Sequence, residues 1–287
     1  MITVKLKDKI VAHEPLFFEF QKKIKVCRED ITRDVTIYTD RSLNDLDINS
    51  KYNIACLVES PEITKKEYDY IENNYKKFDI ILTFHKKFLD MNSKKFKLQL
   101  YGTTWINAVY RKIYDKSNLC SFISSNKRQT NGHKLRHTII NKLEKNKNIH
   151  FYGGKFRKLP YMTTKSFQNE HSGQHITNNK INGLKNYMFS ITIENCKSDY
   201  YFTEKLIDCF LTGTVPIYWG CPSIYKFFNK DGILSFDTKE ECINIVENLS
   251  EQKYNEMLPY IKENFETAKS YVRYILNEKE IINLVNN

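Results

Sequence analysis

Residues 187–222 read YMFSITIENCKSDYYFTEKLIDCFLTGTVPIYWGCP, and their pattern indicates the fold class. Residues 187–193 are almost all apolar or β-branched, as are residues 215–219, so each run predicts a short buried strand. Between them, a threonine at the start and a glycine after the end frame residues 203–211 as a helix. The order strand, helix, strand is typical of a parallel α/β sheet.

Polar residues gather after the first of these strands and at the start of the helix. The strand delivers Glu194 and Asn195 to its C-terminal edge, where ligands bind in open α/β sheets. The first helical turn holds Glu204 and Lys205, and a lysine at a helix N-terminus attracts a diphosphate. Glu204 can accept from ribose hydroxyls, and Tyr201 can stack or donate to a phosphate. From the residues alone, an ordinary capped helix is the alternative.

The N-terminal part alternates in the same way. Runs rich in β-branched and aromatic residues at 35–38, 54–58 and 79–84 predict three strands. Apolar residues spaced three and four apart, after Thr64 as N-cap, predict a helix over 64–78. These elements again indicate a parallel α/β unit.

A polar break at 114–118 separates this series from a second one. After the break we expect strands at 119–124 and 149–152, a helix at 134–143, and helical structure beyond Ser250.

A chain of 287 residues has the length of about two domains. We therefore expect two α/β domains with a cleft between them, one over residues 1–117 and one over 118–287. The last helix could pack back on the first domain.

Positive charge is concentrated in one segment. The chain has 45 Lys and Arg against 34 Asp and Glu, a net charge of +11. Residues 119–187 alone contain 13 basic and two acidic residues, so this segment accounts for the whole excess. Such a field indicates an anionic partner, which could be nucleotide phosphates, nucleic acid or an anionic membrane face. For the lysines within 142–147, a solvated basic surface is an equal alternative.

Location and redox state are predicted from what the sequence lacks. No apolar run approaches the ~18 to 20 residues that span a bilayer, and Met1–Lys9 lacks the apolar core of a secretory signal. Seven widely spaced cysteines without a C-x-x-C pair argue against disulfides and a zinc site. We expect a cytoplasmic protein with free, mostly packed thiols.

Motifs for nucleotides and metals are sparse. Neither the P-loop pattern nor G-x-G-x-x-G occurs. Two histidine pairs have helical i, i+4 spacing: His133 with His137, and His171 with His175. Neither pair has the glutamate of H-E-x-x-H. The triplet Asp45-Leu46-Asp47 has a carboxylate spacing that suits a divalent cation, but it lies among turn-forming residues, so we expect a solvated turn and no metal site.

The block at the helix start resembles a known family. YFTEKLID at 201–208, followed by GTVPIYWG at 213–220, is similar to the α1,3/α1,4-fucosyltransferases, especially their bacterial-type members. The preceding residues 193–195, Ile-Glu-Asn, look like that family's Phe-Glu-Asn with Ile in place of Phe.

Weaker matches extend the resemblance over about residues 52–265. Ser125-Asn126 and the helix carrying Arg136 are similar to the family's Ser-Asn strand end and the arginine of its next helix. Glu59-Ser60-Pro61 looks like the Glu-Ser-Pro element that carries the proposed base, although only three residues match.

The resemblance implies a GT-B fold, with two Rossmann-like domains facing across a cleft. The C-terminal domain would bind GDP-fucose and the N-terminal domain the acceptor sugar. The implied reaction is an inverting transfer of L-fucose from GDP-fucose to a hydroxyl of an oligosaccharide or glycoconjugate, most simply in an α1,3 linkage, as a step of glycan biosynthesis.

The resemblance also implies roles for residues. Glu59 would be the base that takes the acceptor proton, while Arg136 and Lys205 would hold the departing diphosphate. The donor nucleotide would be bound by Asn126, Arg136, Asn195, Tyr201, Glu204 and Lys205. Because two protein cations serve the leaving group, no obligatory metal or other cofactor is expected.

Departures from the family leave alternatives. The motif residues grip nucleotide and phosphates, and residues 156–183 match nothing in the family, so another nucleotide-sugar donor is the nearest alternative. The membrane anchor of animal members and the heptad-repeat tail of some bacterial members are not seen, so a peripheral membrane contact is left open.

The rival from a different class is a non-enzymatic nucleic-acid-binding α/β protein. It is disfavoured because aromatic residues in 119–187 are few and not interleaved with the basic ones. A membrane-surface module is disfavoured because no basic amphipathic helix is evident.

Overall fold

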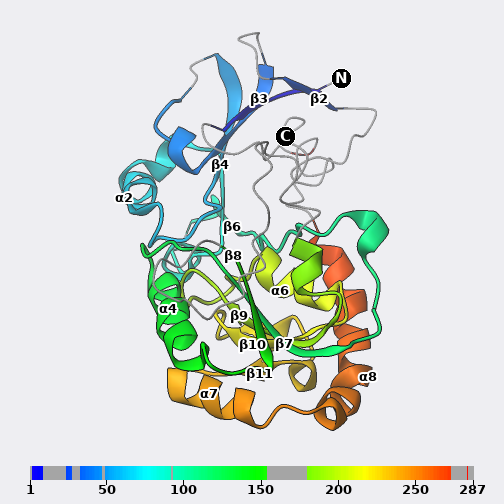
Figure 1. Cartoon of the computed structure of the whole chain (residues 1–287). Helices are drawn as coiled ribbons and strands as arrows, with labels where there is room; N and C mark the ends of the chain where they lie inside the picture. Colours follow the sequence, from blue (N-terminus) through cyan, green and yellow to red (C-terminus); the bar gives the residue numbers. More distant parts are fainter. Residues whose placement is uncertain are drawn as a thin grey trace. The chain divides into compact units, whose positions relative to one another are not determined.

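The computed structural model describes residues 2–8, 24–27, 33–46, 49–91, 93–153, 180–272 and 283. The chain divides into two compact units (Figure 1). Among the described residues, unit 1 contains those up to Tyr101 together with Asp199–Tyr201 and Asn283. Unit 2 contains Gly102–Ser198 and Phe202–Val272.

Unit 1 is built on a six-stranded parallel sheet with the order β2-β1-β3-β4-β5-β6. Its strands are β1 (Ile2–Lys7), β2 (Ile24–Cys27), β3 (Arg33–Thr39), β4 (Ser50–Cys56), β5 (Ile80–Thr83) and β6 (Phe96–Leu98). The three predicted strands are β3, β4 and β5. The sequence analysis missed β1, β2 and β6, because β1 alternates lysine with apolar residues and the other two are very short.

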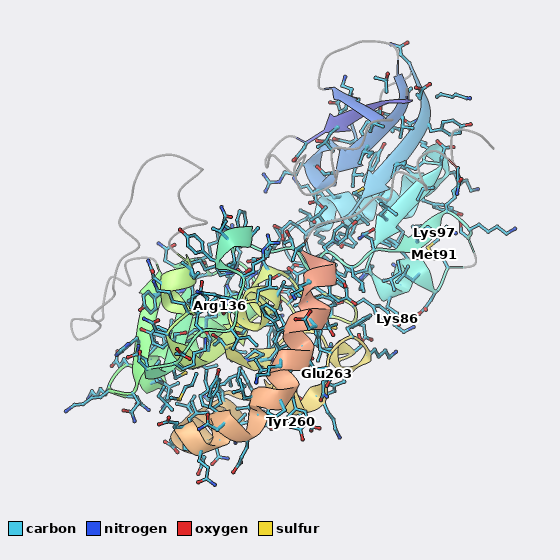
Figure 2. All side chains as sticks on the ribbon, turned by 90° about the vertical axis from the view of Figure 1, so that its right-hand side faces the viewer. Lys86, Met91, Lys97, Arg136, Tyr260 and Glu263 are labelled. Atoms are coloured by element: carbon cyan, nitrogen blue, oxygen red, sulfur yellow. The ribbon has the colours of Figure 1, made fainter. Side chains whose placement is uncertain are left out.

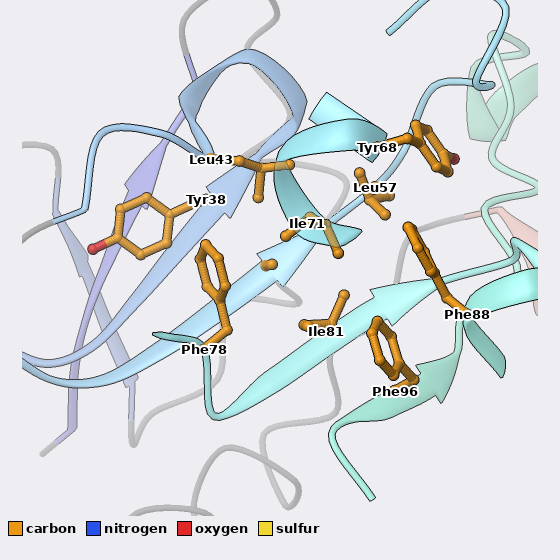
Figure 3. Packing of buried hydrophobic residues seen from close by; sticks show 10 residues of the cluster. Tyr38, Leu43, Leu57, Tyr68, Ile71, Phe78, Ile81, Phe88 and Phe96 are labelled. Atoms are coloured by element: carbon orange, nitrogen blue, oxygen red, sulfur yellow. The ribbon is translucent and has the colours of Figure 1, made fainter. Parts of the chain in front are cut away.

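Helix α2 (Lys65–Asn74) covers part of this sheet. Its buried residues Tyr68 and Ile71 belong to one apolar cluster with Leu57, Ile81 and Phe88 (Figure 3). Phe88 comes from the short helix α3 (Lys86–Leu89). The spacing of three and four residues therefore predicted the buried face of α2 correctly, and a 3₁₀ turn at Tyr75–Lys77 completes the predicted helix.

Unit 2 is built on a five-stranded parallel sheet with the order β11-β10-β9-β7-β8. Its strands are β7 (Asn118–Ser124), β8 (Ile149–Gly153), β9 (Tyr187–Ile193), β10 (Val215–Trp219) and β11 (Leu234–Ser235). Every residue of β9 and β10 is buried. A parallel strand covered on both faces has no polar alternation, which explains the continuous apolar runs in the sequence.

The described residues of unit 2 form helices α4 (Asn131–Leu143), α6 (Glu204–Phe210), α7 (Lys239–Glu247) and α8 (Glu251–Ala268). Helix α6 packs on α8, β9 and β10, while α4 packs on α7. Gly213 ends α6 as predicted, because it takes the left-handed φ of 71° and its N–H donates to the Phe210 carbonyl at 3.0 Å.

The two units meet in the sequence at Tyr101 and Gly102, before the boundary expected at 117/118. Residues 102–117 pack on unit 2: the Thr104 hydroxyl and the Trp105 N–H donate to the buried carboxylate of Asp208, at 2.5 and 3.0 Å. Lys116 donates to the Thr212 carbonyl at 2.7 Å. The assignment of acceptor binding to one domain and donor binding to the other stays a prediction.

Six cysteines are buried free thiols, in agreement with the sequence: Cys56, Cys120, Cys196, Cys209, Cys221 and Cys242. Within the described ranges, no helix is both long enough and apolar enough to cross a membrane.

Candidate functional site

The C-terminal end of β9 meets the N-terminus of α4. The N–H of Gly132 donates to the carbonyl oxygen of Asn195 at 3.0 Å. A Cβ at position 132 would lie 1.8 Å from the carbonyl oxygen of Glu194, so only glycine permits this approach. The contact carries Arg136, about one turn further along α4, to the end of β9.

Arg136 is held in a fixed orientation at this strand end. The residue is buried, with 4% of its surface exposed, and Figure 2 labels it in unit 2. Its Nε donates to the Ile193 carbonyl at 3.1 Å, and its Nη2 donates to the same oxygen and, at 3.1 Å, to Oδ1 of Asn195. The acceptors in these bonds are neutral, so they orient the guanidinium group without cancelling its charge.

Glu194 fixes the start of α6. This carboxylate is fully buried, and it accepts the Thr203 N–H at 2.8 Å and the Thr203 hydroxyl at 2.7 Å. The Thr203 side chain in turn caps the helix by accepting the Lys205 N–H. A carboxylate thus already lies at the N-terminus of α6, which has only seven residues. A diphosphate at this position would therefore have to be bound by side-chain cations rather than by the helix dipole.

Lys205 is the cation at this helix start. Its Nζ lies 3.0 Å from Oε1 of Glu204 and 3.5 Å from Oε2 of Glu194, and its side chain is 24% exposed. Burial alone would lower the pKa of Lys205, but the two carboxylates raise it above its usual range. Burial would likewise raise the pKa of Glu204, but Lys205 and Lys180 lower it to about 2. Both groups are therefore charged at neutral pH.

The pKa of His133, at the start of α4, is affected by several nearby cations. The pKa of His133 is lowered to about 4, first by burial and then by Arg136, Lys127 and Lys205. The imidazole is therefore neutral at pH 7. It serves as part of a capping box, because its Nδ1 accepts the N–H of Thr130 at 3.2 Å. The cations near it form a region suited to an anion.

The other predicted donor-binding residues fall into two groups. Asn195 contacts Arg136 directly, and Asn126 is exposed in the loop after β7, at the same edge of the sheet. Tyr201 instead belongs to unit 1, where it is 2% exposed and its ring lies 4.8 Å from that of Phe84. The structure gives Tyr201 a packing role, and its part in donor binding stays a prediction.

Glu59 lies where the sequence places it, just beyond the C-terminal end of β4. The residue is partly exposed, and the hydroxyl of Tyr68 donates to its carbonyl oxygen at 2.9 Å. Its N–H donates to the carboxyl group of Asp40. The backbone of Glu59 is therefore anchored on two sides, by α2 and by the segment after β3.

The candidate metal sites are occupied by other interactions or lie outside the described residues. His137 Nε2 bonds the Lys127 carbonyl at 3.0 Å, and Asp45 pairs with Lys7 at 3.7 Å. The placement of Asp47, His171 and His175 is not described. Among the side chains that the structure places, no three His, Cys, Asp or Glu form a group that could hold a metal ion.

Two site residues were not assigned a role from the sequence. Glu194 orients Thr203 and Lys205, and its signal was a carboxylate directly after a strand of almost entirely apolar or β-branched residues. Asp40 contacts the Glu59 backbone, and its signal was similar, because it follows the predicted strand 35–38 as Glu59 follows the predicted strand 54–58.

Two curated relatives match part of this chain. An alpha-(1,3)-fucosyltransferase of Helicobacter pylori is 35% identical over 109 residues, which are 36% of this chain and 23% of that protein. A putative fucosyltransferase of Acanthamoeba polyphaga mimivirus is 33% identical over 97 residues, which are 34% of this chain and 14% of that protein. The chain therefore spans less than a quarter of the length of either relative.

Solved structures share the fold at low sequence identity. An α1,3-fucosyltransferase crystallised with GDP matches with a TM-score of 0.58 and 17% identity, covering 100% of this chain and 90% of that one. HepE of Anabaena, crystallised with UDP and glucose, matches with a TM-score of 0.62 and 10% identity, covering 100% and 98%. These likenesses confirm the predicted α/β fold of GT-B type.

The family follows from a match to more than half of the sequence. The profile of the C-terminal part of glycosyltransferase family 10 (fucosyltransferase) matches residues 113–274 of 287. These residues include α4, β9, α6 and β10. The match therefore covers Arg136 and Lys205 and the residues that hold these two cationic side chains. The chain belongs to glycosyltransferase family 10, the fucosyltransferases.

Proposed function

We propose that this chain is an inverting glycosyltransferase that moves L-fucose from GDP-fucose to a hydroxyl group of a glycan, in an α1,3 linkage. Family membership supports the reaction class. The name of the Helicobacter pylori relative supports the linkage, and a structure of this fold solved with GDP-fucose supports the donor.

One observation carries the proposal: Arg136 and Lys205 converge on the C-terminal end of β9. Arg136 is fixed by the Ile193 carbonyl and Asn195, while Lys205 is fixed by Glu204, Glu194 and Thr203. Arginine can bind a diphosphate through two parallel hydrogen bonds, and lysine adds a point charge. Held in place before the reaction, such cations stabilise negative charge as it develops on a leaving group.

The proposed reaction is a single displacement. Glu59 takes the proton of the acceptor hydroxyl, and the hydroxyl oxygen attacks the anomeric carbon of fucose. The bond from that carbon to the diphosphate oxygen breaks, and its electron pair leaves with GDP. Arg136 and Lys205 stabilise the negative charge of the departing GDP. Glu59 is in unit 1 and both cations are in unit 2.

A second candidate keeps the mechanism and changes the donor. HepE of Anabaena and an alpha-glucosyltransferase, which share this fold at TM-scores of 0.62 and 0.55, were solved with UDP. Arg136 and Lys205 would bind the diphosphate of either nucleotide. The guanine or uracil base of the donor, and its sugar, must therefore be tested directly.

Thermal unfolding with nucleotides tests the donor. A nucleotide at ~100 times its Kd stabilises the folded state by about 2.7 kcal/mol. For a unit of this size that shifts the midpoint by roughly 5–10 °C. We expect such a shift with GDP, a smaller one with UDP and none with a short oligonucleotide. An equal or larger shift with UDP would favour the second candidate, and no shift with either nucleotide would contradict both.

A donor and acceptor screen then tests the reaction. GDP-fucose incubated with a panel of glycans should release GDP only with certain acceptors, and the linkage of the product can be read by NMR. Release of GDP without transfer, or transfer only from another nucleotide sugar, would overturn the proposed substrate.

A further inference from the structure

Asp40 and Glu59 lie at the same edge of the sheet in unit 1. Strands β3 and β4 are parallel neighbours, and Thr39 at the end of β3 is opposite Cys56 at the end of β4. Asp40 directly follows β3, and Glu59 comes three residues after β4. The pairing of the two strands thus brings together two carboxyl groups that are far apart in the sequence.

The carboxyl group of Asp40 binds the backbone that leads to Glu59. The N–H of Val58 donates to Oδ1 of Asp40 at 3.0 Å, and the N–H of Glu59 lies 3.3 Å from both carboxyl oxygens. Asp40 is 8% exposed, so water competes little for these bonds. One buried side chain therefore fixes two successive peptide groups of the loop.

The backbone at Asp40 is itself strained. Its φ is 34°, in the left-handed region that residues with a Cβ seldom adopt. Such conformations persist where the surrounding structure determines them, and they gather at functional sites. Here the strained residue aims its carboxyl group at the loop that carries Glu59.

The charges around Asp40 are mostly negative. Burial, followed by the nearby carboxylates of Glu59 and Glu67, raises the pKa of Asp40 to about 8, against the lowering effect of the two N–H donors. The pKa of the Cys56 thiol on β4 is raised, first by burial and then by Asp40. Asp40 is therefore mainly protonated at neutral pH and adds little negative charge beside Glu59.

We infer that Asp40 is a positioning residue for Glu59: its side chain holds the loop that presents the Glu59 carboxylate to the acceptor hydroxyl. This inference rests on the proposed role of Glu59 as the base. Asp40 does not touch the substrates in this scheme, and it acts through the backbone of Val58 and Glu59.

Two substitutions separate the shape of this group from its charge. Asp40→Asn keeps an acceptor oxygen and resembles the protonated acid, whereas Asp40→Ala removes the acceptor. Asp79→Asn is the matched control, because Asp79 also accepts a backbone N–H in this sheet, from Asn53 at 2.7 Å, but is exposed at the opposite end of the strands. The assay measures kcat, the KM of both substrates and the pH profile of kcat/KM.

We expect Asp40→Ala to lower kcat by about 10- to 100-fold, the scale of a misplaced catalytic group, with GDP-fucose KM unchanged. Asp40→Asn should stay within about threefold of the wild type at pH 7, since it reproduces the neutral acid. Above pH 8 the wild type should lose activity, because two ionised carboxylates repel and displace Glu59, while Asp40→Asn should stay level. Asp79→Asn should match the wild type throughout.

Each other outcome is informative. If Asp40→Ala keeps its kcat, or if the wild type and Asp40→Asn have the same profile above pH 8, the inference is wrong. If Asp40→Asn loses as much as Asp40→Ala at pH 7, the ionised form matters and the neutral-acid role is overturned. The inference alone fails when Glu59→Gln is inactive but Asp40→Ala is not. When Glu59→Gln is active, the base assignment fails first.

Discussion

The C-terminal edges of the two sheets carry opposite electrostatics. In unit 2, beyond β9, the carboxylate of Glu204 lies among cations, and Lys205 with Lys180 lowers its pKa to about 2. In unit 1, beyond β3 and β4, Asp40 lies beside Glu59 and away from solvent, and its pKa is raised to about 8. The edge in unit 2 keeps Glu204 ionised at neutral pH, and the edge in unit 1 keeps Asp40 mainly protonated.

The contrast suits a transfer reaction whose two tasks are divided between two similar sheets. Parallel sheets deliver polar residues to the same edge whatever the chemistry, so the edge itself does not choose a ligand. Cations fixed beyond β9 suit a leaving diphosphate, and carboxyl groups beyond β4 suit an incoming hydroxyl. Substituting the residues at each edge tests whether the two edges perform these two tasks.

The C-terminal edge of the sheet in unit 2, where Arg136 and Lys205 lie, is called the cation edge. The largest effect is expected there. Lys205→Ala and Arg136→Ala should each remove ~2 to 4 kcal/mol of transition-state stabilisation, the scale for one key charge-stabilising donor. The measurement is kcat/KM with GDP-fucose, together with the affinity for GDP. Arg136→Lys should recover only part of the loss, because lysine cannot make the two parallel bonds of arginine.

Lys239→Ala is the matched control for Lys205→Ala. Lys239 also opens a helix and pairs with the glutamate next to it, Glu240, at 3.4 Å. Its loss should leave kcat/KM unchanged. Wild-type rates in Lys205→Ala and Arg136→Ala would remove the diphosphate from this edge, as long as thermal unfolding shows that both variants are folded.

The corresponding edge in unit 1, which carries Asp40 and Glu59, is called the carboxyl edge. The next effect is expected there. Glu59→Gln should lower kcat by about 10² or more, the usual scale for a general base, while GDP affinity stays unchanged. Glu62→Gln, three residues further on, is the control and should remain active. A Glu59→Gln enzyme with normal kcat would place the base elsewhere, and one that fails to bind GDP would break the division of tasks between the edges.

Sequence patterns predicted the cation edge well because its elements are set by local rules. Strand β9 spans residues 187–193 as expected, and α6 begins after its Thr203 cap and ends before Gly213. An all-buried parallel strand has a continuous apolar run, and caps mark helix ends chemically, so both can be recognised without knowledge of the tertiary structure.

The remaining features depend on contacts between distant residues. The bond from Arg136 to the Ile193 carbonyl joins residues 57 apart, and the contact of Glu59 with Asp40 joins residues 19 apart. Tyr201 follows the predicted donor strand in the sequence, but it packs in unit 1 against Phe84. Strand pairing and packing determine these contacts, so they cannot be predicted from the spacing of residue types along the sequence.

A smaller effect should appear in the pH dependence of stability. The folded pKa of Asp40, about 8, exceeds its ordinary value of 3.8, so folding takes up a proton between these values. The stabilisation is complete below pH 3.8 and is lost as the pH rises to about 8. Glu204 behaves oppositely: its stabilisation is complete above its ordinary pKa of 4.5 and is lost as the pH falls to about 2. Each contributes a slope of at most ~1.4 kcal/mol per pH unit.

Urea unfolding between pH 3 and 9 measures both slopes. Both tryptophans, Trp105 and Trp219, are in unit 2, so their fluorescence follows that unit, and hydrogen exchange of β3 and β4 peptides follows unit 1. Asp40→Asn should flatten the fall of unit 1 stability between pH 4 and 8, and Glu204→Gln should flatten the fall of unit 2 stability below pH 4.5. Equal slopes in the variants and the wild type would contradict the assigned charge states.

The smallest effect is expected from metal removal. If Arg136 and Lys205 neutralise the leaving diphosphate, a divalent cation has little left to stabilise there, since a metal at this position would perform the same task. EDTA should therefore leave most fucosyl transfer intact, and added manganese should stimulate it modestly at best. The control is a transferase known to need manganese, assayed in the same buffer. Complete loss of activity on chelation, restored by a divalent ion, would favour Asp45 and Asp47 as ligands of a metal ion. It would also contradict the main charge-stabilising role of Arg136.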